Sequence, residues 1–459
     1  MRAPNQAGAH SGKQTKQQHE PSSVAGLPAR QAAAKLLSAV VDAHTSMDGL
    51  TDEDNGHPAY RALDGRDRAL VRAILLSALR RRGTIAAAIA AQLERPLPGN
   101  ALALDHLLHV AATQILFLDV PDRAAVDLAV EQAKADPRTR RFDKLVNGVL
   151  RSIVRQKAAI LASPPVPDVP DWFVARLVEA YGTSKAEAIL EAHRTEAPVD
   201  FTVKADPEAW AERLGGIVMP TGTVRVARPG GPISTLPGYD DGAWWVQDAA
   251  AALPARLMGD VAGLHVADLC AAPGGKTAQL IHAGARVTAL DVSRNRLKRL
   301  RANLDRLGLE ATVLEADLAK FEPDQLFDAV LLDAPCSSTG TIRRHPDVAW
   351  SKTPEEIAKL AAVQARLLDH AVRMVKPGGH VVFSNCSLHP LEGEQLLQTV
   401  LAERDDLALE PIEPAAFPEL ASFITASGAV RTTPADLPHA DPALSGMDGF
   451  FAARLRRLG

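Results

Sequence analysis

The feature that most constrains the fold of this chain is a regular alternation of strand-like and helix-like segments in its C-terminal part. The segments are strand 264–268, helix 276–283, strand 286–291, helix 294–307, strand 311–315, strand 328–333, helix 355–375 and strand 380–385. This order predicts an α/β, doubly wound parallel sheet, because right-handed crossovers return each strand to the same direction. Ligands of such sheets bind beyond the carboxyl ends of the strands, so we expect the functional residues there.

The stretch from Val266 to Lys276 ends the first of these strands in a glycine turn. It reads Val-Ala-Asp-Leu-Cys-Ala-Ala-Pro-Gly-Gly-Lys, so a short apolar run gives way to a turn and then to a helix-forming segment. A tight turn at a helix N-terminus presents free backbone N–H groups and the positive end of the helix dipole to a ligand. The turn lacks the Gly-x-Gly that opens a dinucleotide-binding loop, which argues against a pyrophosphate ligand.

Two acidic residues follow the next strands at positions that suit a nucleoside. Asp291 ends its strand 23 residues after Asp268, where a carboxylate can accept the two ribose hydroxyls of a nucleotide-like ligand. A role for Asp291 as a helix cap is the weaker interpretation, since Ser293 is better placed to cap helix 294–307. With Asp317 after the third strand, this layout predicts an adenosine-containing cofactor without a pyrophosphate, and S-adenosylmethionine fits.

Two of the three cysteines stand at strand ends. The segment Asp333-Ala334-Pro335-Cys336 follows the fourth strand, and Cys386 follows the last one. A free cysteine is ordinarily a small buried hydrophobe, which is the interpretation that suits Cys270. The polar neighbours and the strand-end placement of the other two indicate a chemical role. A metal site that adds His345 or His389 is a minor alternative, because two cysteines alone make a poor site.

A thiol beside a methyl donor has a specific use. Carbon 5 of a pyrimidine is a poor nucleophile, and a thiolate that adds to carbon 6 makes carbon 5 nucleophilic through a covalent intermediate. Such a thiol needs a lowered pKa or a nearby base, and the carbon 5 proton must leave afterwards. Asp333 could hydrogen-bond the ring nitrogen and exocyclic amine of a cytosine, which would first be unstacked. These arguments do not choose between Cys336 and Cys386 as the nucleophile.

The rest of the chain divides by composition. Its 459 residues favour two or three domains. Residues 1–27 are rich in Gln, Ser, Gly, His and Pro, which predicts a disordered tail. Residues 28–160 carry apolar side chains at helical spacing, which predicts an all-α domain. A stiff proline-rich linker opens a small α+β subdomain over 161–235, and the doubly wound domain takes up 236–459.

Composition also limits the class of protein. An apolar content of 46% with a mean hydropathy of -0.05 is typical of a soluble globular protein. We find neither an apolar run long enough to span a bilayer nor a secretory leader, so we expect a cytoplasmic protein without a membrane partner. Three cysteines exclude a disulfide framework. With a net charge of -4, nucleic-acid binding would need local basic clusters, and candidates lie at 138–155, 294–301 and 343–344.

Motifs in both halves of the chain resemble known families. Three segments are together similar to the NusB family of RNA-binding helical domains, although each alone could serve packing or capping: 64–68, 118–121 and 142–151. Four others resemble the signature motifs of RNA cytosine-5 methyltransferases: Asp268–Lys276, Asp333–Ser337, Asn385–Leu388 and Gly446–Phe451. The combination is similar to bacterial 16S ribosomal RNA methyltransferases of the RsmB/Sun family. Asn385 departs from that pattern, which more often has Thr before the cysteine.

This resemblance implies an enzyme with a NusB-like RNA-binding domain, a small α+β subdomain and a Rossmann-like, class I methyltransferase domain. It implies methyl transfer from S-adenosylmethionine to carbon 5 of a cytosine in 16S rRNA, free or partly assembled, without a metal. The sequence does not give the oligomeric state, and we favour a monomer. Cys386 would be the nucleophile and Cys336 would assist product release, with Asp333 and Lys276 as further catalytic groups. The implied cofactor residues are Cys270, Ala271, Ala272, Pro273, Gly274, Gly275, Lys276, Asp291, Asp317 and Asp333.

Two alternative functions stay open at this point. The enzyme could methylate another RNA, such as transfer RNA. The chain could also be a non-catalytic RNA-binding or ribosome-assembly adaptor with a vestigial methyltransferase fold. The presence of both strand-end thiols together with Asp333 and Lys276 argues against the adaptor.

Overall fold

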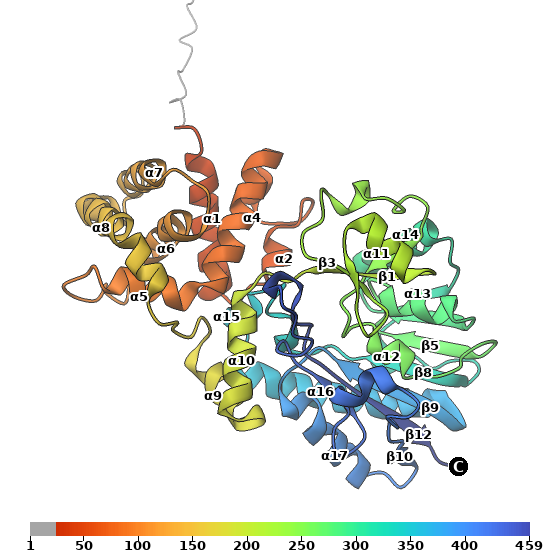
Figure 1. Cartoon of the computed structure of the whole chain (residues 1–459). Coiled ribbons are helices and arrows are strands. Elements are labelled where there is room, and N and C mark those ends of the chain that lie inside the picture. The colour runs from red at the N-terminus through yellow and green to blue at the C-terminus, as the bar shows by residue number, and fades with distance from the viewer. Residues whose placement is uncertain (1–23) are drawn as a thin grey trace, which may run out of the picture.

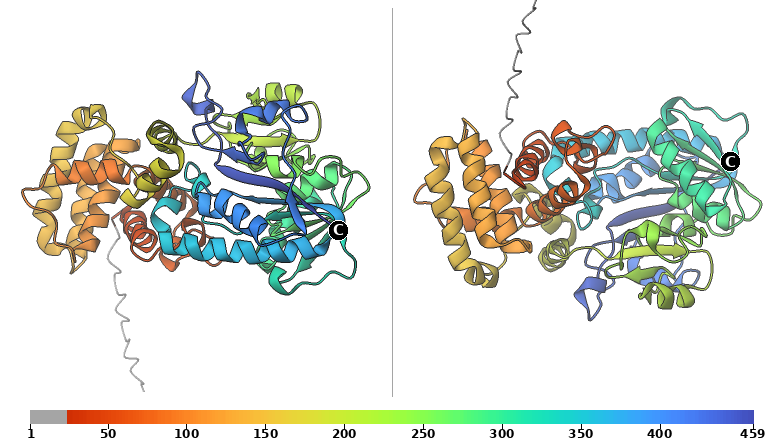
Figure 2. Two further views of the ribbon diagram at one scale, coloured as in Figure 1. Left: turned by 90° about the horizontal axis from the view of Figure 1, so that it is seen from below. Right: turned by 90° about the horizontal axis from the view of Figure 1, so that it is seen from above.

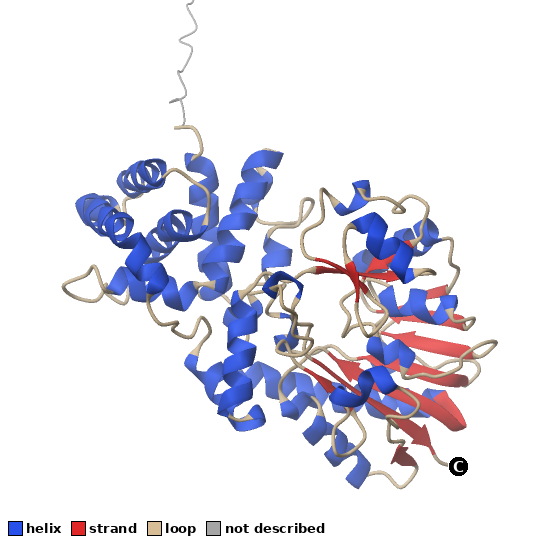
Figure 3. Ribbon diagram, viewed as in Figure 1, coloured by secondary structure: helices blue, strands red, loops and turns tan. Residues whose placement is uncertain are grey.

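The computed structural model describes residues 24–459, which form three parts (Figure 1). A helical domain occupies the N-terminal end, a large sheet flanked by helices occupies the C-terminal end, and a smaller sheet packs beside the large one (Figure 3). The predicted disordered tail, 1–27, lies outside the described residues except for its last four, and α1 already begins at Leu27. In the described part of the chain, no helix is long and apolar enough to cross a membrane.

The N-terminal domain is built from helices, as its apolar spacing predicts. They are α1 (Leu27–Val41), α2 (Met47–Leu50), α3 (Pro58–Arg61), α4 (Gly65–Arg80), α5 (Arg82–Ala90), α6 (Leu102–Phe117), α7 (Asp122–Ala135), η1 (Arg140–Phe142) and α8 (Asp143–Ala162). Helix α6 is buried along most of its length, and α1, α4, α5, α7 and α8 pack around it. Asp64 fixes the start of α4, because its Oδ1 accepts the N–H of Asp67 at 2.8 Å.

An extended, proline-rich segment, 163–170, leaves the helical domain. Its far end is held in place, because Asp168 accepts the backbone N–H of Thr84 and pairs with Arg194, both at 2.7 Å. The helices α9 (Asp171–Tyr181) and α10 (Thr183–Arg194) follow. Gly182 separates them with a φ of 75°, a conformation that favours glycine.

The small subdomain contains a four-stranded antiparallel sheet in the order β2-β3-β1-β4. Its elements are β1 (Val199–Val203), α11 (Pro207–Leu214), β2 (Ile217–Val218), β3 (Val224–Val226), η2 (Ile233–Thr235) and β4 (Trp244–Val246). The predicted boundary at residue 235 is therefore too early, because β4 pairs with β1 and completes this sheet. Trp244 packs edge-on against Phe201 with ring centroids 4.7 Å apart, so both rings belong to the core of the small sheet.

The large sheet has eight strands in the order β10-β12-β9-β8-β5-β6-β7, with β11 paired to β12. They are β5 (His265–Leu269), β6 (Arg286–Asp291), β7 (Thr312–Glu315), β8 (Phe327–Asp333), β9 (Val375–Asn385), β10 (Leu407–Leu409), β11 (Val430–Thr432) and β12 (Phe450–Arg457). Strands β5 to β9 are parallel, as predicted. The sheet is not parallel throughout, because β12 runs antiparallel to β9, β10 and β11. Loops and short turns, rather than a crossover helix, lead into β12, so it can enter in the opposite direction.

Helices cover both faces of the large sheet (Figure 2). The remaining elements are α12 (Leu253–Arg256), α13 (Gly275–His282), α14 (Arg294–Leu307), η3 (Leu318–Lys320), η4 (Thr339–Thr341), α15 (Val348–Ser351), α16 (Pro354–Met374), η5 (Pro390–Glu392), α17 (Glu394–Ala402), η6 (Pro418–Phe423) and η7 (Pro442–Leu444). One face packs on α16 and α17 through Leu368 and Leu397, and the other packs on α12 and α13 through Leu253 and Leu280. The chain runs outward from β5 to β7 and then crosses to β8 on the opposite side of β5. This reversal marks the carboxyl ends of β5 and β8 as the ligand-binding edge.

Candidate active site

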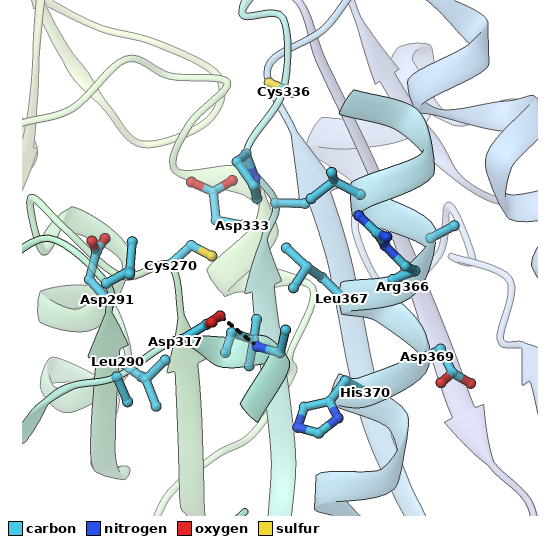
Figure 4. Close-up of a pocket in the computed structure, with 18 of the residues that line it drawn as sticks. Cys270, Leu290, Asp291, Asp317, Asp333, Cys336, Arg366, Leu367, Asp369 and His370 are labelled. Atoms are coloured by element: carbon cyan, nitrogen blue, oxygen red, sulfur yellow. Dashed lines mark hydrogen bonds between the residues drawn. The ribbon is translucent and has the colours of Figure 1, made fainter. Parts of the chain in front are cut away.

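The carboxyl ends of the parallel strands meet at a cavity of about 1140 Å³. The residues of the predicted site that line it are Cys270, Asp291, Asp317, Asp333, Cys336 and Cys386. Figure 4 shows Cys270 between Asp291 and Asp333, with Cys336 beyond Asp333. The fold thus brings together polar side chains that lie far apart in the sequence.

The other predicted residues of the glycine turn line a second cavity of about 420 Å³. They are Ala271, Ala272, Pro273, Gly274, Gly275 and Lys276. Asp333 lines both cavities, so the two spaces lie on either side of this carboxylate. The sequence predicted a single site for the turn, the carboxylates and the thiols, whereas the structure has two adjoining cavities there.

The glycine turn has a backbone that few residue types adopt. Cys270 has a φ of 61° and Gly274 a φ of 101°, both in the region that favours glycine. A Cβ on Gly274 would also lie 3.0 Å from Cγ of Leu300 on α14, so the turn packs closely on that helix. Asp291 braces the turn from the end of β6, because its Oδ2 accepts the N–H of Ala272 at 3.2 Å.

The large cavity has the chemistry that an adenosine-containing cofactor requires. Asp291 and Asp317 place carboxylate oxygens after successive strands, and the side chain of the first is 1% exposed while that of the second is 48% exposed. Asp317 also begins η3 by accepting the N–H of Ala319 at 3.1 Å (dashed line in Figure 4). Leu290 and Leu318 add apolar wall. Apolar walls with a few convergent acceptors suit a purine nucleoside, so these residues fit S-adenosylmethionine.

An ion pair occupies the boundary between the two cavities. Lys276 Nζ donates to Oδ2 of Asp333 at 2.7 Å, and Ser384 Oγ donates to its Oδ1 at 3.0 Å. The same ammonium lies 5.1 Å from the centre of the Phe450 ring, a favourable cation–π distance. Donors from two elements, α13 and β9, therefore fix the Asp333 carboxylate at the edge where the thiols lie.

The two strand-end thiols are in direct contact. The Sγ atoms of Cys336 and Cys386 lie 3.5 Å apart, which is hydrogen-bond distance for sulfur. The hydrogen bond with Cys386, together with burial, raises the pKa of Cys336. The same hydrogen bond lowers the pKa of Cys386, because the neighbouring thiol donates to its thiolate form. The contact therefore favours Cys386 as the thiolate and Cys336 as its proton-bearing partner.

Cys270 has a different environment from these two. Burial raises its pKa to about 12, and its side chain packs against the core under the sheet. A thiol of this kind stays protonated and is a poor nucleophile. Its place in the site is that of a wall residue.

Several groups beside the site have no catalytic or cofactor role in the sequence prediction, although Arg344 belongs to one of the candidate basic clusters. Phe450 lies against Lys276, and Arg344 lines the second cavity while Asp448, fully buried, accepts its Nε at 2.9 Å. Both Phe450 and Asp448 belong to the closing motif, which was noticed as a resemblance without a chemical task. Glu392, which lies behind the two thiols, comes from a segment with no motif, so no local signal could have found it.

The described residues, 24–459, contain no cluster of three or more His, Cys, Asp or Glu side chains arranged to hold a metal ion. The two histidines of the alternative metal site have other partners. His345 lies 3.7 Å from Asp48 on α2, and His389 accepts the N–H of Leu391.

Known proteins resemble this chain over most of its length. It is 35% identical over 399 residues to ribosomal RNA small subunit methyltransferase B of Salmonella enteritidis PT4 (strain P125109), covering 83% of this chain and 91% of that protein. A protein of the same name from Salmonella paratyphi C (strain RKS4594) is 34% identical over the same share. Residues 258–456 match the family described as 16S rRNA methyltransferase RsmB/F. The chain belongs to this RsmB/F family. Residues 27–155 match the NusB family, which confirms that resemblance too.

Solved structures share the fold. The crystal structure of PH0851 aligns with a TM-score of 0.68 at 22% identity and covers 94% of this chain and 98% of that one. A methyltransferase homolog from Pyrococcus horikoshii aligns with a TM-score of 0.52 at 28% identity and covers 63% of this chain and 95% of that one. The predicted fold class is therefore confirmed. As a member of the RsmB/F family, the protein is a methyltransferase that uses S-adenosylmethionine, as predicted.

Proposed function

We propose that this RsmB/F family member methylates carbon 5 of a cytosine in 16S ribosomal RNA through a covalent bond between Cys386 and carbon 6. The observation that carries the proposal is the 3.5 Å contact between Cys336 and Cys386 at the wall of the cofactor cavity. A paired thiol with a lowered pKa is the nucleophile that this chemistry needs. A methyl acceptor that is itself nucleophilic, such as an amine, would need no thiol.

The cofactor would be held by the glycine turn 270–276, by Asp291 and Asp317, and by Asp333. When bound, S-adenosylmethionine supplies an electrophilic methyl group. The carboxylates of Asp291 and Asp317 can accept hydrogen bonds from the ribose hydroxyls. Leu290 and Leu318 in the cavity wall can pack on the adenine.

The side chains of the thiol edge supply the remaining steps. Addition of Cys386 Sγ to carbon 6 forms the sulfur–carbon bond and moves the electron pair of the double bond onto carbon 5, which then takes the methyl group. Asp333 is placed to accept from the exocyclic amine of the cytosine, and Lys276 keeps this carboxylate in position. After methyl transfer, removal of the carbon 5 proton re-forms the double bond and expels Cys386. We assign this elimination to Cys336, whose sulfur contacts the leaving one. Once Cys386 is bonded to carbon 6 its thiolate no longer holds the Cys336 proton, so Cys336 can lose that proton to solvent and, as a thiolate, take the carbon 5 proton.

Ribosomal RNA is the substrate that the relatives support. The similar Salmonella proteins are named for the small ribosomal subunit, and the N-terminal domain belongs to the NusB family. A flipped-out cytosine is accessible in RNA that is free or partly assembled, so we expect such RNA in the cytoplasm to be the substrate.

The test uses the full chain, labelled S-adenosylmethionine and 16S rRNA, either protein-free or partly assembled. We expect label on carbon 5 of a cytosine, and Cys386→Ala should reduce incorporation to background because it removes the sulfur that activates carbon 5. Ser422→Ala is the control, since it removes an exposed hydroxyl that lines neither cavity and should leave incorporation intact. Absence of label in every RNA offered to the wild-type enzyme would overturn the proposal.

A further inference from the structure

A buried carboxylate, Glu392, lies directly behind the two thiols. Its side chain is fully buried at the end of η5, and all its hydrogen-bond partners are neutral groups. A buried carboxylate is costly unless its lone pairs are used and its charge is balanced. Arg431, whose guanidinium donates to the main-chain oxygen of Ser387, supplies a positive charge nearby. We therefore look for the role of Glu392 in the segments that its hydrogen bonds connect.

The partners of Glu392 are the residues that follow the two cysteines. Its Oε1 accepts the backbone N–H of Ser337 at 2.9 Å and the amide of Gln364 at 2.8 Å. Its Oε2 accepts the hydroxyls of Ser337 and Ser387, both at 2.5 Å. One side chain thus binds the residue after Cys336 and the residue after Cys386 at the same time.

The residue before Cys386 joins the same network. Asn385 Nδ2 donates to the main-chain oxygen of Glu392 at 2.6 Å and to Oε1 of Gln364 at 3.2 Å. Its own Oδ1 accepts the N–H of Ser387 at 3.0 Å. The segment around the nucleophile is therefore held on both sides, and Asn385, which departs from the family pattern, is part of what holds it.

We propose that Glu392 is a positioning residue for methyl transfer, because it clamps the two thiol-bearing loops together and so keeps Cys336 in hydrogen-bond contact with Cys386. This inference rests on the proposed function, in which both thiols act on one base. Glu392 accepts hydrogen bonds from four groups. These bonds set the distance between the loops that follow the neighbouring strands β8 and β9.

The charge of Glu392 acts in the same sense as its hydrogen bonds. The pKa of Cys336 is raised first by its hydrogen bond with Cys386, then by burial, and further by the negative charges of Cys386 and Glu392. The Glu392 carboxylate therefore favours the arrangement in which Cys336 keeps its proton and donates a hydrogen bond to Cys386. Loss of the clamp would remove the hydrogen bond from Cys336, and the pKa of Cys386 would rise as a result.

Two substitutions separate the hydrogen bonds from the charge. Glu392→Gln keeps an oxygen that can accept from Ser337 N–H and Gln364, and its amide can donate to the two hydroxyls once they rotate. Glu392→Ala removes all four contacts. Ser387→Ala removes one of the hydroxyl contacts to Glu392, together with the hydroxyl that accepts the N–H of His389 at 3.0 Å, and it serves if Glu392→Ala does not fold.

The measurement is the rate at which iodoacetamide alkylates Cys386 and Cys336, read by mass spectrometry on the full chain, with methylation of rRNA measured in parallel. In the wild type, Cys386 should react faster than Cys336. Glu392→Ala should abolish this preference and lower kcat by about 100-fold, the size of effect expected from misplacing a reacting group. Glu392→Gln should retain most of the alkylation preference and most of kcat. Ser387→Ala should show losses between those of Glu392→Gln and Glu392→Ala. The affinity for S-adenosylmethionine should not change, because Glu392 does not line the cofactor cavity.

Glu410→Ala is the matched control, since it removes a partly buried carboxylate that pairs with Arg454 away from the thiols. Equal losses of alkylation preference and kcat in Glu392→Gln and Glu392→Ala would overturn the proposed positioning role. A preference for Cys386 that survives both Glu392→Ala and Ser387→Ala would overturn it too. A parallel fall in cofactor affinity would show a general structural role instead. Alkylation needs no RNA, so a failure of the proposed function would leave the thiol preference and its dependence on Glu392 still measurable.

Discussion

Asp268, Cys336 and Cys386 each owe their protonation state to burial and to close neighbours. Asp268 is fully buried at the end of β5, where its Oδ2 accepts the Thr277 hydroxyl at 2.6 Å. Among the residues that the structure describes, none donates to its Oδ1. Burial raises the pKa of Asp268 to about 7. The protein thus keeps an under-satisfied carboxyl beside its glycine turn, at a cost in stability.

The cost of Asp268 should be visible as a pH dependence of stability. Between the ordinary pKa of 3.8 and about 7, the folded carboxyl holds a proton that the unfolded chain has released, so the stability falls as the pH rises through this window. Asp268→Asn removes this effect. Thermal unfolding should show no gain for the variant below the window and a growing gain up to neutral pH, at about 1.4 kcal/mol for each unit of pKa shift. Asp324→Asn, at an exposed carboxylate, should show no such trend, and a gain at Asp268 that is independent of pH would contradict the account.

At the scale of single elements, local signals were sufficient where a segment carries its own pattern. Helix α14 has the bounds that the sequence predicts, because four leucines, 297, 300, 304 and 307, form one buried face. Ser293 begins it by accepting the N–H of Arg296, as predicted, and Gly308 ends it in a left-handed conformation. The strand ends that carry Asp291, Asp333 and the two cysteines could be located in the same way.

Elements whose identity depends on distant partners could not be located. Strand β4 looks like the entrance to the next domain, because nothing near Trp244 in the sequence tells that its ring packs on Phe201. Glu392 is 55 residues from Ser337, so its hydrogen bond to that loop has no local trace. The same limit applied to the pairing of the thiols, since Cys336 and Cys386 are 50 residues apart and meet only across two strands.

At the scale of the whole molecule, the helical domain packs on the segment that follows Cys336. Trp350 on α15 donates its ring N–H to the main-chain oxygen of Leu79 at 3.0 Å, and Arg82 lies over its ring. Asp347 accepts the N–H of Met47 at 2.9 Å. The segment after Cys336 and the NusB-family domain are therefore parts of one contiguous structure, with the exposed segment 161–167 as their covalent link.

Trp350 should hold the two domains together even when that link is cut. We expect a protein cleaved at a protease site inserted between Ser163 and Pro164 to elute as a single complex in size-exclusion chromatography. Trp350→Ala should let the fragments separate, because loss of a packed indole weakens a contact by about 3 kcal/mol. Trp350→Phe keeps most of the ring and should preserve the complex. Fragments that separate in the wild type, or that stay together in the alanine variant, would contradict this role.

In the proposed reaction, Cys386 forms the covalent bond to the RNA and Cys336 is needed to break it. The most direct measurement incubates Cys336→Ala with S-adenosylmethionine and 16S rRNA, isolates the protein under denaturing conditions, and identifies the nucleotide-bearing peptide by mass spectrometry. We predict a stable adduct between a methylated cytidine nucleotide and Cys386, which the additional change Cys386→Ala abolishes. An adduct that accumulates instead in Cys386→Ala, with the nucleotide on Cys336, would contradict the assignment of the two thiols.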